Sequence, residues 1–370
     1  MNTMKRTLCG AAVVAAGICS GPALAQVVIY GVYDTGVEYV TNATAAKGSV
    51  WRMPNITGAQ PSRLGFRGTE DLGGDLKAVF VLETGFDPGA GTIGQGNRLF
   101  GRQANVGLRN ANGTLMLGRQ YSMLSTALSG ADVVGPSIHS AINNDPYINN
   151  ARTDNSVGYL GTFSNLRVGA TYSFGRDTSA AGGAGGSNCP GEVAGNRRAC
   201  RQVTAMLGYS TDSVGVAAAY DIMYGNTGAT NVSGPANPLT SSSFNDERFV
   251  FDGFFKVGAV KIGAGLIDRK THATKETGTQ LAFLGASYPF ANAWVLDGQV
   301  SRLKVKNTAD ASTLFVARGT YSFSKRTAAY ASLGYMRNRG AAAIPVDNGG
   351  VVGAPGMNQT GIMTGMRITF

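Results

Sequence analysis

The sequence is poor in the residue types on which enzyme active sites and metal centres usually depend. Its 370 residues include only 2 histidines and 15% charged residues. His139 and His272 lie far apart, and neither has a nucleophile or a metal ligand at a suitable spacing. We therefore read both as polar loop residues and expect no catalytic group, no metal site and no cofactor.

Long apolar runs are also missing once the first 25 residues are set aside. Residues 1–25 read as a cleaved secretory signal peptide, in which a basic start and a short apolar run precede the A-x-A site Ala23-Leu24-Ala25. No uninterrupted apolar stretch of about 18 residues remains in 26–370, which excludes a membrane-spanning helix there. We expect one exported domain over 26–370, either soluble or a transmembrane barrel.

Cysteine is scarce as well. Two of the four cysteines fall in the expected signal peptide, which leaves Cys189 and Cys200 in a glycine-rich, polar segment. An even pair in an exported chain predicts a disulfide formed in an oxidising compartment. Two free thiols are the alternative, and a metal site would lack a nearby histidine.

Glycine and alternating hydrophobicity dominate what is present. Glycine accounts for 53 of the 370 residues, and sixteen segments alternate apolar and polar residues with a period of two. In one segment Leu166, Val168 and Tyr172 share a face, whereas Arg167 and Thr171 share the opposite face. Each segment thus predicts a strand with one apolar and one polar side.

The connections between these segments alternate between tight turns and long polar loops. The eight long loops lie near 41–61, 87–99, 121–153, 175–201, 224–246, 268–279, 304–312 and 337–358. A soluble sandwich would show the same alternation along its strands. The even strand count, the loop asymmetry and the signal peptide favour an all-β, 16-stranded antiparallel transmembrane β-barrel with a water-filled lumen.

The chain resembles the Gram-negative general porins, in particular their betaproteobacterial and neisserial-like branch. Five segments carry the resemblance: IYGVYDTGVEY (29–39), RLGFRGTEDLGGDLKAVFVLETGF (63–86), LFGRQANVGLRN (99–110), TLMLGRQYS (114–122) and the final GMRITF. The resemblance implies a trimeric pore in the cell outer membrane. It also implies that the third long loop, 121–153, folds inward and narrows the channel between basic wall residues and acidic residues. The terminal aromatic residue, Phe370, resembles the assembly signal of outer-membrane barrels.

Two criteria together select the residues of this constriction: the resemblance, and strand parity, meaning the side of a strand on which the alternation places a residue. The expected set is Arg63, Arg67, Glu83, Arg102, Asp132 and Arg152. Arg102 shares the parity of the outward-facing Ala104 and Val106, so its inclusion requires a bulge or a position above the hydrocarbon band. Between the two acids of the loop, Asp132 is preferred over Asp145 because it lies nearer the middle.

Inward-facing positive charge exceeds negative charge on the expected strands. Eleven cations (Arg63, Arg67, Lys77, Arg109, Arg152, Arg167, Arg248, Lys256, Lys261, Arg318 and Arg367) stand against five acids (Glu83, Asp154, Asp221, Asp252 and Asp297). We therefore expect a general diffusion porin for small hydrophilic solutes and ions, with a weak to moderate preference for anions.

Other functions remain open at this stage. A substrate-specific channel, or a surface adhesin or structural protein that uses the barrel as an anchor, would carry the same strands. A barrel hydrolase would need a Ser/His pair or a carboxylate cluster in the lumen. The expected partners are a homotrimer, outer-membrane lipid and lipopolysaccharide, whereas export argues against nucleic acid.

Overall fold

The computed structural model describes residues 26–54, 58–145, 147–148, 151–179, 186–230, 237–347 and 349–370. The expected signal peptide, residues 1–25, lies outside the described residues. The described strands are β1 (Gln26–Val40), β2 (Val50–Arg52), β3 (Arg63–Gly73), β4 (Leu76–Gly85), β5 (Gln103–Asn110), β6 (Gly113–Tyr121), β7 (Arg152–Thr153), β8 (Ser156–Phe163), β9 (Leu166–Ser173), β10 (Gln202–Ser210), β11 (Val214–Tyr224), β12 (Asn245–Val257), β13 (Val260–His272), β14 (Glu276–Ala291), β15 (Trp294–Val305), β16 (Ala311–Ser322), β17 (Thr327–Arg339) and β18 (Gln359–Thr369). The helices are α1 (Gly94–Asn97), α2 (Met123–Leu128) and the 3-10 turn η1 (Ala141–Asn144), and none of them is long and apolar enough to cross a membrane.

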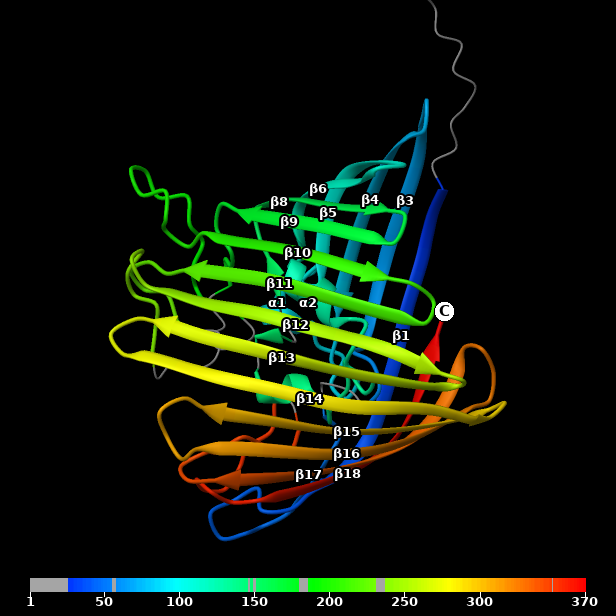
Figure 1. Cartoon of the computed structure of the whole chain (residues 1–370), viewed down its shortest axis with the longest axis vertical. Coiled ribbons are helices and arrows are strands. Elements are labelled where there is room, and N and C mark those ends of the chain that lie inside the picture. The colour runs from blue at the N-terminus through cyan, green and yellow to red at the C-terminus, as the bar shows by residue number, and fades with distance from the viewer. Residues whose placement is uncertain are drawn as a thin grey trace, which may run out of the picture.

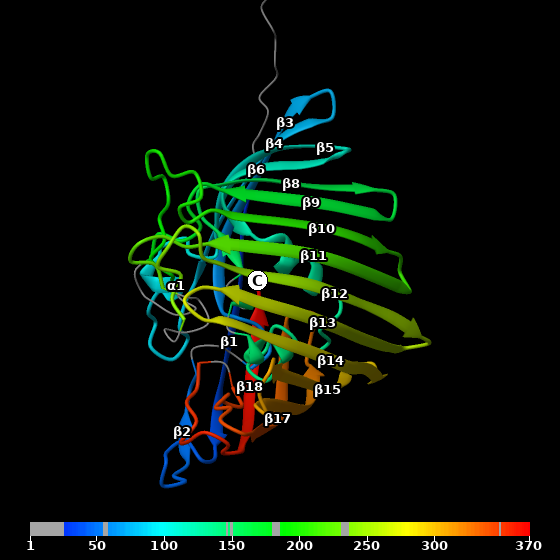
Figure 2. The ribbon, with the colours of Figure 1, turned by 60° about the vertical axis from the view of Figure 1, so that its left-hand side comes forward.

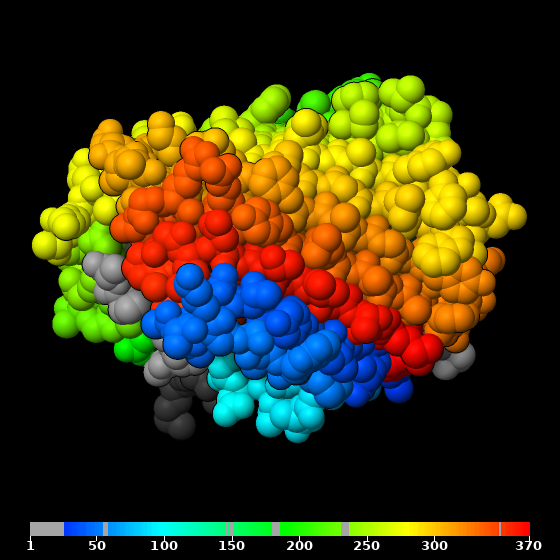
Figure 3. Space-filling model, turned by 90° about the horizontal axis from the view of Figure 1, so that it is seen from below, coloured from blue at the N-terminus to red at the C-terminus, as the bar shows by residue number. Residues whose placement is uncertain are grey.

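The strands form one antiparallel sheet that closes on itself, as Figures 1 and 2 show. The closing pair is β1 with β18, where Val32 lies opposite Thr369 and Val40 lies opposite Gly361. In Figure 3 this seam is the blue N-terminal strand beside the red C-terminal strand. β2 and β7 are additions of three and two residues, and the other sixteen strands make the ring. The predicted 16-stranded antiparallel barrel is therefore confirmed.

Side-chain exposure alternates along the strands as the sequence pattern predicts. On β10, Leu207 is 56% exposed on the outside, whereas Gln202 and Thr204 are fully buried on the inside. Apolar residues cover the outer face of the other spanning strands as well, including Phe251 on β12 and Phe315 on β16. An apolar exterior around a polar interior is the arrangement that a lipid-embedded barrel with an aqueous lumen requires.

Short turns lie at one end of the barrel and longer connections at the other, with two corrections to the predicted loops. The loop expected at 268–279 is only 273–275, because β13 continues to His272 and β14 begins at Glu276. The loop expected at 304–312 is likewise reduced to 306–310. In both cases polar residues continue the strand pairing beyond the apolar band, so polarity alone did not mark the strand ends.

Candidate functional site

The third long connection, 122–151, starts along the inner side of the wall. Its first part is α2, which packs against β9, β10, β11 and β12, and Figure 1 shows α2 within the ring. The backbone N–H of Met123 donates to Thr204 Oγ1 at 2.9 Å, and Leu124 and Leu128 are buried. Thr204 faces inward on β10, so the loop begins by turning into the lumen.

The middle of the loop lies over glycines of β13 and β14, further round the same inner wall. A Cβ atom on Gly263 of β13 would lie only 1.9 Å from the carbonyl oxygen of Ala131, so the close approach of the loop requires glycine there. The guanidinium of Arg318, on β16, donates to the carbonyl oxygens of Val134 at 3.0 Å and Val133 at 3.4 Å. These contacts fix the loop backbone against the inner wall.

His139 attaches the loop to the strands at the barrel seam. Its Nε2 lies 3.0 Å from Glu38 Oε1 on β1, and its Nδ1 lies 2.8 Å from Ser332 Oγ on β17. The other carboxylate oxygen of Glu38 accepts a 2.9 Å hydrogen bond from Arg52 Nε. His139 lies in the loop as predicted, and its side chain is completely buried between the loop and the wall. The other histidine, His272, was also expected in a loop, but it is the last residue of β13.

The returning part of the loop is bonded to three further strands from the inside. Asn144 donates to Ser301 Oγ of β15 at 2.9 Å. Asp145 accepts two hydrogen bonds from Arg248 of β12, at 2.7 Å and 3.1 Å. The hydroxyl of Tyr147 donates to Asp221 of β11 at 2.7 Å. The loop therefore follows the inner wall and occupies part of the lumen.

Opposite this wall, basic residues and one acid form a continuous chain of contacts on the inner face, which we call the arginine ladder. Arg102 Nε donates to Glu83 Oε1 at 2.6 Å, and Arg63 Nε lies 3.7 Å from Glu83 Oε2. Arg102 also donates to the hydroxyl of Tyr121 at 2.7 Å, and Arg152 donates to the same hydroxyl at 3.1 Å. The ladder thus contains Arg63, Glu83, Arg102, Tyr121 and Arg152.

Arg102 reaches this ladder in spite of the outward parity of Ala104 and Val106. It precedes β5, where the strand alternation has not yet begun, and its backbone N–H donates to the carbonyl oxygen of Glu83 at 3.0 Å. No bulge is needed, because Arg102 lies in the connection that joins β4 to β5 at the loop end of the barrel. Arg67 lies next to the ladder, with its guanidinium 5.2 Å from the centre of the Tyr30 ring.

Asp132 lies on the far side of the lumen from the ladder. Ala131 and Val133, on either side of it, lie over β13. In the sixteen-stranded ring, β13 is eight strands away from β4, which carries Glu83, so the two strands face each other across the lumen. Its Oδ1 accepts hydrogen bonds from the backbone N–H groups of Gly135 at 2.9 Å and Val134 at 3.2 Å. Burial raises the pKa of the Asp132 carboxyl above its usual value of 3.8.

Sequence reasoning missed several inner-face groups. Tyr30 donates to Glu83 at 2.9 Å, and Tyr121 connects Arg102 to Arg152, but neither tyrosine stood out from the apolar residues of its strand. The count of inward charge also omitted Asp34, Glu38 and Asp246, which are fully buried. Their inward parity was the signal that could have found them.

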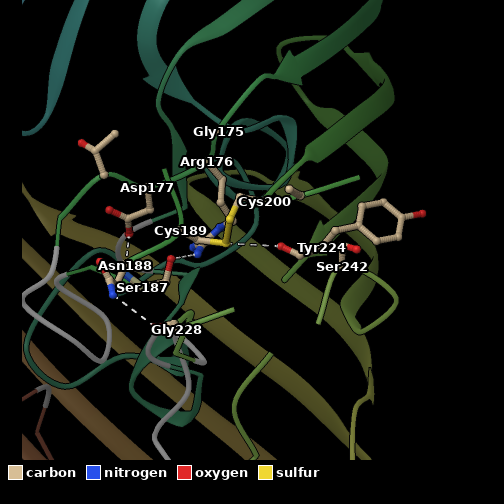
Figure 4. The surroundings of a disulfide bond; sticks show 12 residues. Gly175, Arg176, Asp177, Ser187, Asn188, Cys189, Cys200, Tyr224, Gly228 and Ser242 are labelled. Atoms are coloured by element: carbon tan, nitrogen blue, oxygen red, sulfur yellow. Dashed lines mark hydrogen bonds between the residues drawn. A yellow bond between two sulfur atoms is a disulfide. The ribbon is translucent and has the colours of Figure 1, made fainter. Parts of the chain in front are cut away.

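Cys189 and Cys200 form a disulfide within the fourth long loop, 174–201, which Figure 4 shows. The bonded pair lies beside the loop that follows β11: Cys200 N donates to Gly225 O at 3.0 Å, and Asn188 Nδ2 donates to Gly228 O at 3.1 Å. Both sulfur-bearing residues are buried. The disulfide thus supports the loop end of the barrel and lies outside the arginine ladder.

Phe370 closes the chain against its beginning. Its backbone exchanges hydrogen bonds with Gly31 of β1, at 3.0 Å and 3.2 Å. A Cβ atom on Gly31 would lie 2.4 Å from Cζ of the Phe370 ring, so the ring packs directly over this glycine. The terminal aromatic residue therefore completes the seam of the barrel.

Known proteins share this arrangement. A family model described as Gram-negative porin matches residues 10–341. Outer membrane porin protein 32 of Delftia acidovorans is 30% identical, over 99% of this chain and 100% of its own length. An outer membrane porin protein of Bordetella pertussis is 37% identical, and that match spans 59% of this chain and 59% of the relative.

Solved structures share the fold. The anion-selective porin from Comamonas acidovorans has a TM-score of 0.75 at 24% identity, covering 94% of this chain and 100% of that chain. OmpT of Vibrio cholerae, in its trimer form, has a TM-score of 0.65 at 16% identity, covering 94% and 99%. With the family model and a full-length relative in agreement, this chain belongs to the Gram-negative porin family and forms a channel in the outer membrane.

Proposed function

We propose that this porin is a general diffusion channel that prefers anions. The observation that carries the proposal is the arginine ladder, in which three guanidinium groups and one carboxylate follow one another along the inner wall. Fixed positive charge in a narrow aqueous path with walls of low dielectric constant raises the local concentration of anions.

The third long loop supports the same proposal by its position. It narrows the lumen, so that ions pass close to the ladder, and it carries Asp132 on the far side. Positive charge on one side and a carboxyl on the other produce a transverse field across the path. The anion selectivity named for the Comamonas acidovorans porin, which shares the fold, agrees with this assignment.

The remaining parts of the proposal concern processing and assembly. We propose cleavage after Ala25, a homotrimer, contacts with outer-membrane lipid and lipopolysaccharide on the outside of the barrel, and no enzymatic reaction. The trimer form named for Vibrio cholerae OmpT supports the oligomeric state. Apolar side chains on the outer face, such as Leu207 and Phe251, support contact with lipid or with neighbouring barrels.

Two measurements on the purified protein test the proposed function. The zero-current potential across a planar bilayer in a KCl gradient is expected to have the sign of chloride preference, and potassium preference would contradict the proposal. Liposome swelling with sugars of increasing size is expected to show a smooth decline in rate with size. Saturation by one sugar would instead indicate a substrate-specific channel.

A further inference from the structure

The added strand β2 places Arg52 on the inner side of the sheet at the loop end of the barrel. β2 pairs with β1 through three residues, and Arg52 lies directly opposite Glu38. On the outer face the ring of Trp51 lies 4.9 Å from that of Tyr39, and Trp51 is 71% exposed. Because side chains alternate along a strand, Arg52 then faces the interior. Figure 2 shows β2 beside β1 at this end of the molecule.

Arg52 joins two buried carboxylates that come from opposite ends of the chain. Its Nε donates to Glu38 Oε2 at 2.9 Å, and its guanidinium also forms an ion pair with Asp347 in the last long loop, 340–358. The side chain of Glu38 is completely buried and that of Asp347 is 1% exposed. Two buried acids on one guanidinium repel each other, and the cation between them offsets that repulsion. Arg52 is that cation.

Glu38 connects Arg52 to the third long loop. The other carboxylate oxygen of Glu38, Oε1, lies 3.0 Å from His139 Nε2. His139 is completely buried, and its second ring nitrogen lies 2.8 Å from Ser332 Oγ on β17. Contacts that run from Arg52 through Glu38 to His139 therefore hold the third long loop at the barrel seam.

Asp347 connects Arg52 to the third long loop by a second route. The residue before it, Val346, is completely buried and packs in one apolar cluster with Val134 of the third loop. The side-chain amide of Asn143, in the same loop, donates to the carbonyl oxygen of Val346 at 3.2 Å. The last long loop thus lies inside the mouth of the barrel and covers part of the third loop.

The two routes end next to each other on the inner wall. A Cβ atom on Gly334 of β17 would lie 2.9 Å from Val346 Cγ2 and 2.9 Å from His139 Cδ2. A Cβ atom on Gly361 of β18 would lie 3.0 Å from Val346 Cγ1 and 2.7 Å from His139 Nε2. Glycine at both positions therefore leaves the space in which His139 and Val346 lie side by side.

We propose that Arg52 is a positioning residue of the channel, which holds the third long loop in the lumen through Glu38 and Asp347. Loss of the Arg52 charge leaves two buried carboxylates without their shared cation, and an unpaired buried charge is strongly unfavourable. Movement of Asp347 into water relieves this, but it also withdraws Val346 from the third loop. The third loop then leaves the wall more often. This role concerns the established channel and is independent of which ion the lumen prefers.

The test measures how fast a buried thiol in the third loop of the purified barrel reacts with a maleimide. A141C places this thiol in η1, at a position that is 2% exposed, while Cys189 and Cys200 are joined in the disulfide. The reaction rate then follows the fraction of time that the loop is away from the wall. R52Q is expected to raise the rate at least about tenfold, because charge-assisted hydrogen bonds are lost.

K306Q is the matched control for the loss of one paired cation. Lys306 forms a 2.6 Å ion pair with Asp268 at the loop end of β13. Asp268 shares the outward parity of the exposed Leu266, so this pair lies on the outer face. K306Q is expected to keep the original labelling rate of A141C. Equal rates in R52Q and K306Q would overturn the proposal.

A second cysteine separates movement of the loop from general unfolding. A328C lies on β17 near the turn end, at a position that is 3% exposed. R52Q is expected to leave the labelling of A328C unchanged. Faster labelling of both cysteines would mean that Arg52 stabilises the whole barrel, and would also overturn the positioning role.

A conservative variant and the channel current complete the test. R52K is expected to label A141C at a rate closer to the original one than R52Q does, because lysine keeps the charge without the fork of the guanidinium. R52K equal to R52Q would show that this charge does not hold the loop. Single-channel recordings should show more open-channel noise in R52Q than in K306Q, and equal noise would contradict the proposal. The zero-current potential of the same preparations reports separately on anion preference.

Discussion

Arg102 and Glu83 are joined side chain to side chain at 2.6 Å and backbone to backbone at 3.0 Å. The double contact fixes a guanidinium just before β5 against a carboxylate on β4. It also explains how a residue of outward parity takes part in an inward-facing cluster. The charge balance of the arginine ladder therefore depends on one acid, Glu83.

Removal of the Glu83 charge is expected to strengthen anion preference. In E83Q the ladder loses its carboxylate, while Arg63, Arg102 and Arg152 remain. The chloride-to-potassium permeability ratio should therefore rise about two- to fivefold. This is the effect expected of one unit charge that acts on a passing ion through water over a few ångströms. Reversal potentials in a KCl gradient measure this ratio. E70Q is the matched control, since Glu70 is exposed near the turn end of β3. The same ratio in E83Q and E70Q would count against the ladder.

The raised pKa of Asp132 leads us to expect that the anion selectivity of the channel depends on pH. Because burial raises the pKa of its carboxyl above 3.8, this group takes up a proton at a higher pH than an ordinary aspartate. Anion preference should therefore increase as the pH falls from about 7 to about 4, as negative charge leaves the lumen. In D132N the increase should be smaller, and reversal potentials measured over this range compare the two proteins. Identical pH profiles would exclude a contribution from Asp132.

The pair of Asp145 and Arg248 predicts the behaviour of the loop. Arg248 is fully buried and donates twice to Asp145 and once to Asp246. D145N therefore removes the charge of one of its two carboxylate partners, a change that costs about 1.5–3 kcal/mol, because Asp246 still pairs the buried guanidinium. We expect the loop to open more often, which single-channel recordings would show as added current noise. D310N, in the loop between β15 and β16, is the control. Quiet channels in D145N would mean that this ion pair does not hold the loop.

Phe370 predicts an effect on assembly. In F370A the ring that packs over Gly31 is lost at the closing seam, and we expect a smaller fraction of the protein to reach the heat-resistant, fast-migrating form on gels of outer-membrane extracts. F323A is the control, because Phe323 is also an exposed aromatic residue at the turn end, away from the seam. Equal folded fractions in the two variants would remove the proposed role of Phe370.

The sequence sufficed for those features that depend on local alternation. Period-two patterning predicted the sixteen strands, and with them the inner-face positions of Arg63 and Glu83. Parity was uninformative for Arg102 because it lies outside the strand. The burial of His139 could not be predicted, since it depends on the path of a loop and on contacts with Glu38 and Ser332, which are distant in sequence.

The strand ends were the other weak point. Lys270 and Lys304 read as loop residues because they are charged, although both continue the strand pairing. The same preference for apolar patterns hid the acids on β1, where Asp34 and Glu38 are fully buried and have polar partners such as Tyr330 and Arg52. Charged residues inside a barrel are satisfied by partners on other strands, and a single sequence does not show those partners.

The central claim is that the arginine ladder selects anions, and the reversal potential of R63Q/R152Q tests it most directly. Loss of two of the three guanidinium groups should lower the chloride-to-potassium permeability ratio at least about fivefold. The control K325Q/R326Q, which removes the same charge from an exposed turn outside the lumen, should keep the wild-type ratio. A ratio in R63Q/R152Q equal to that of the control would contradict the account.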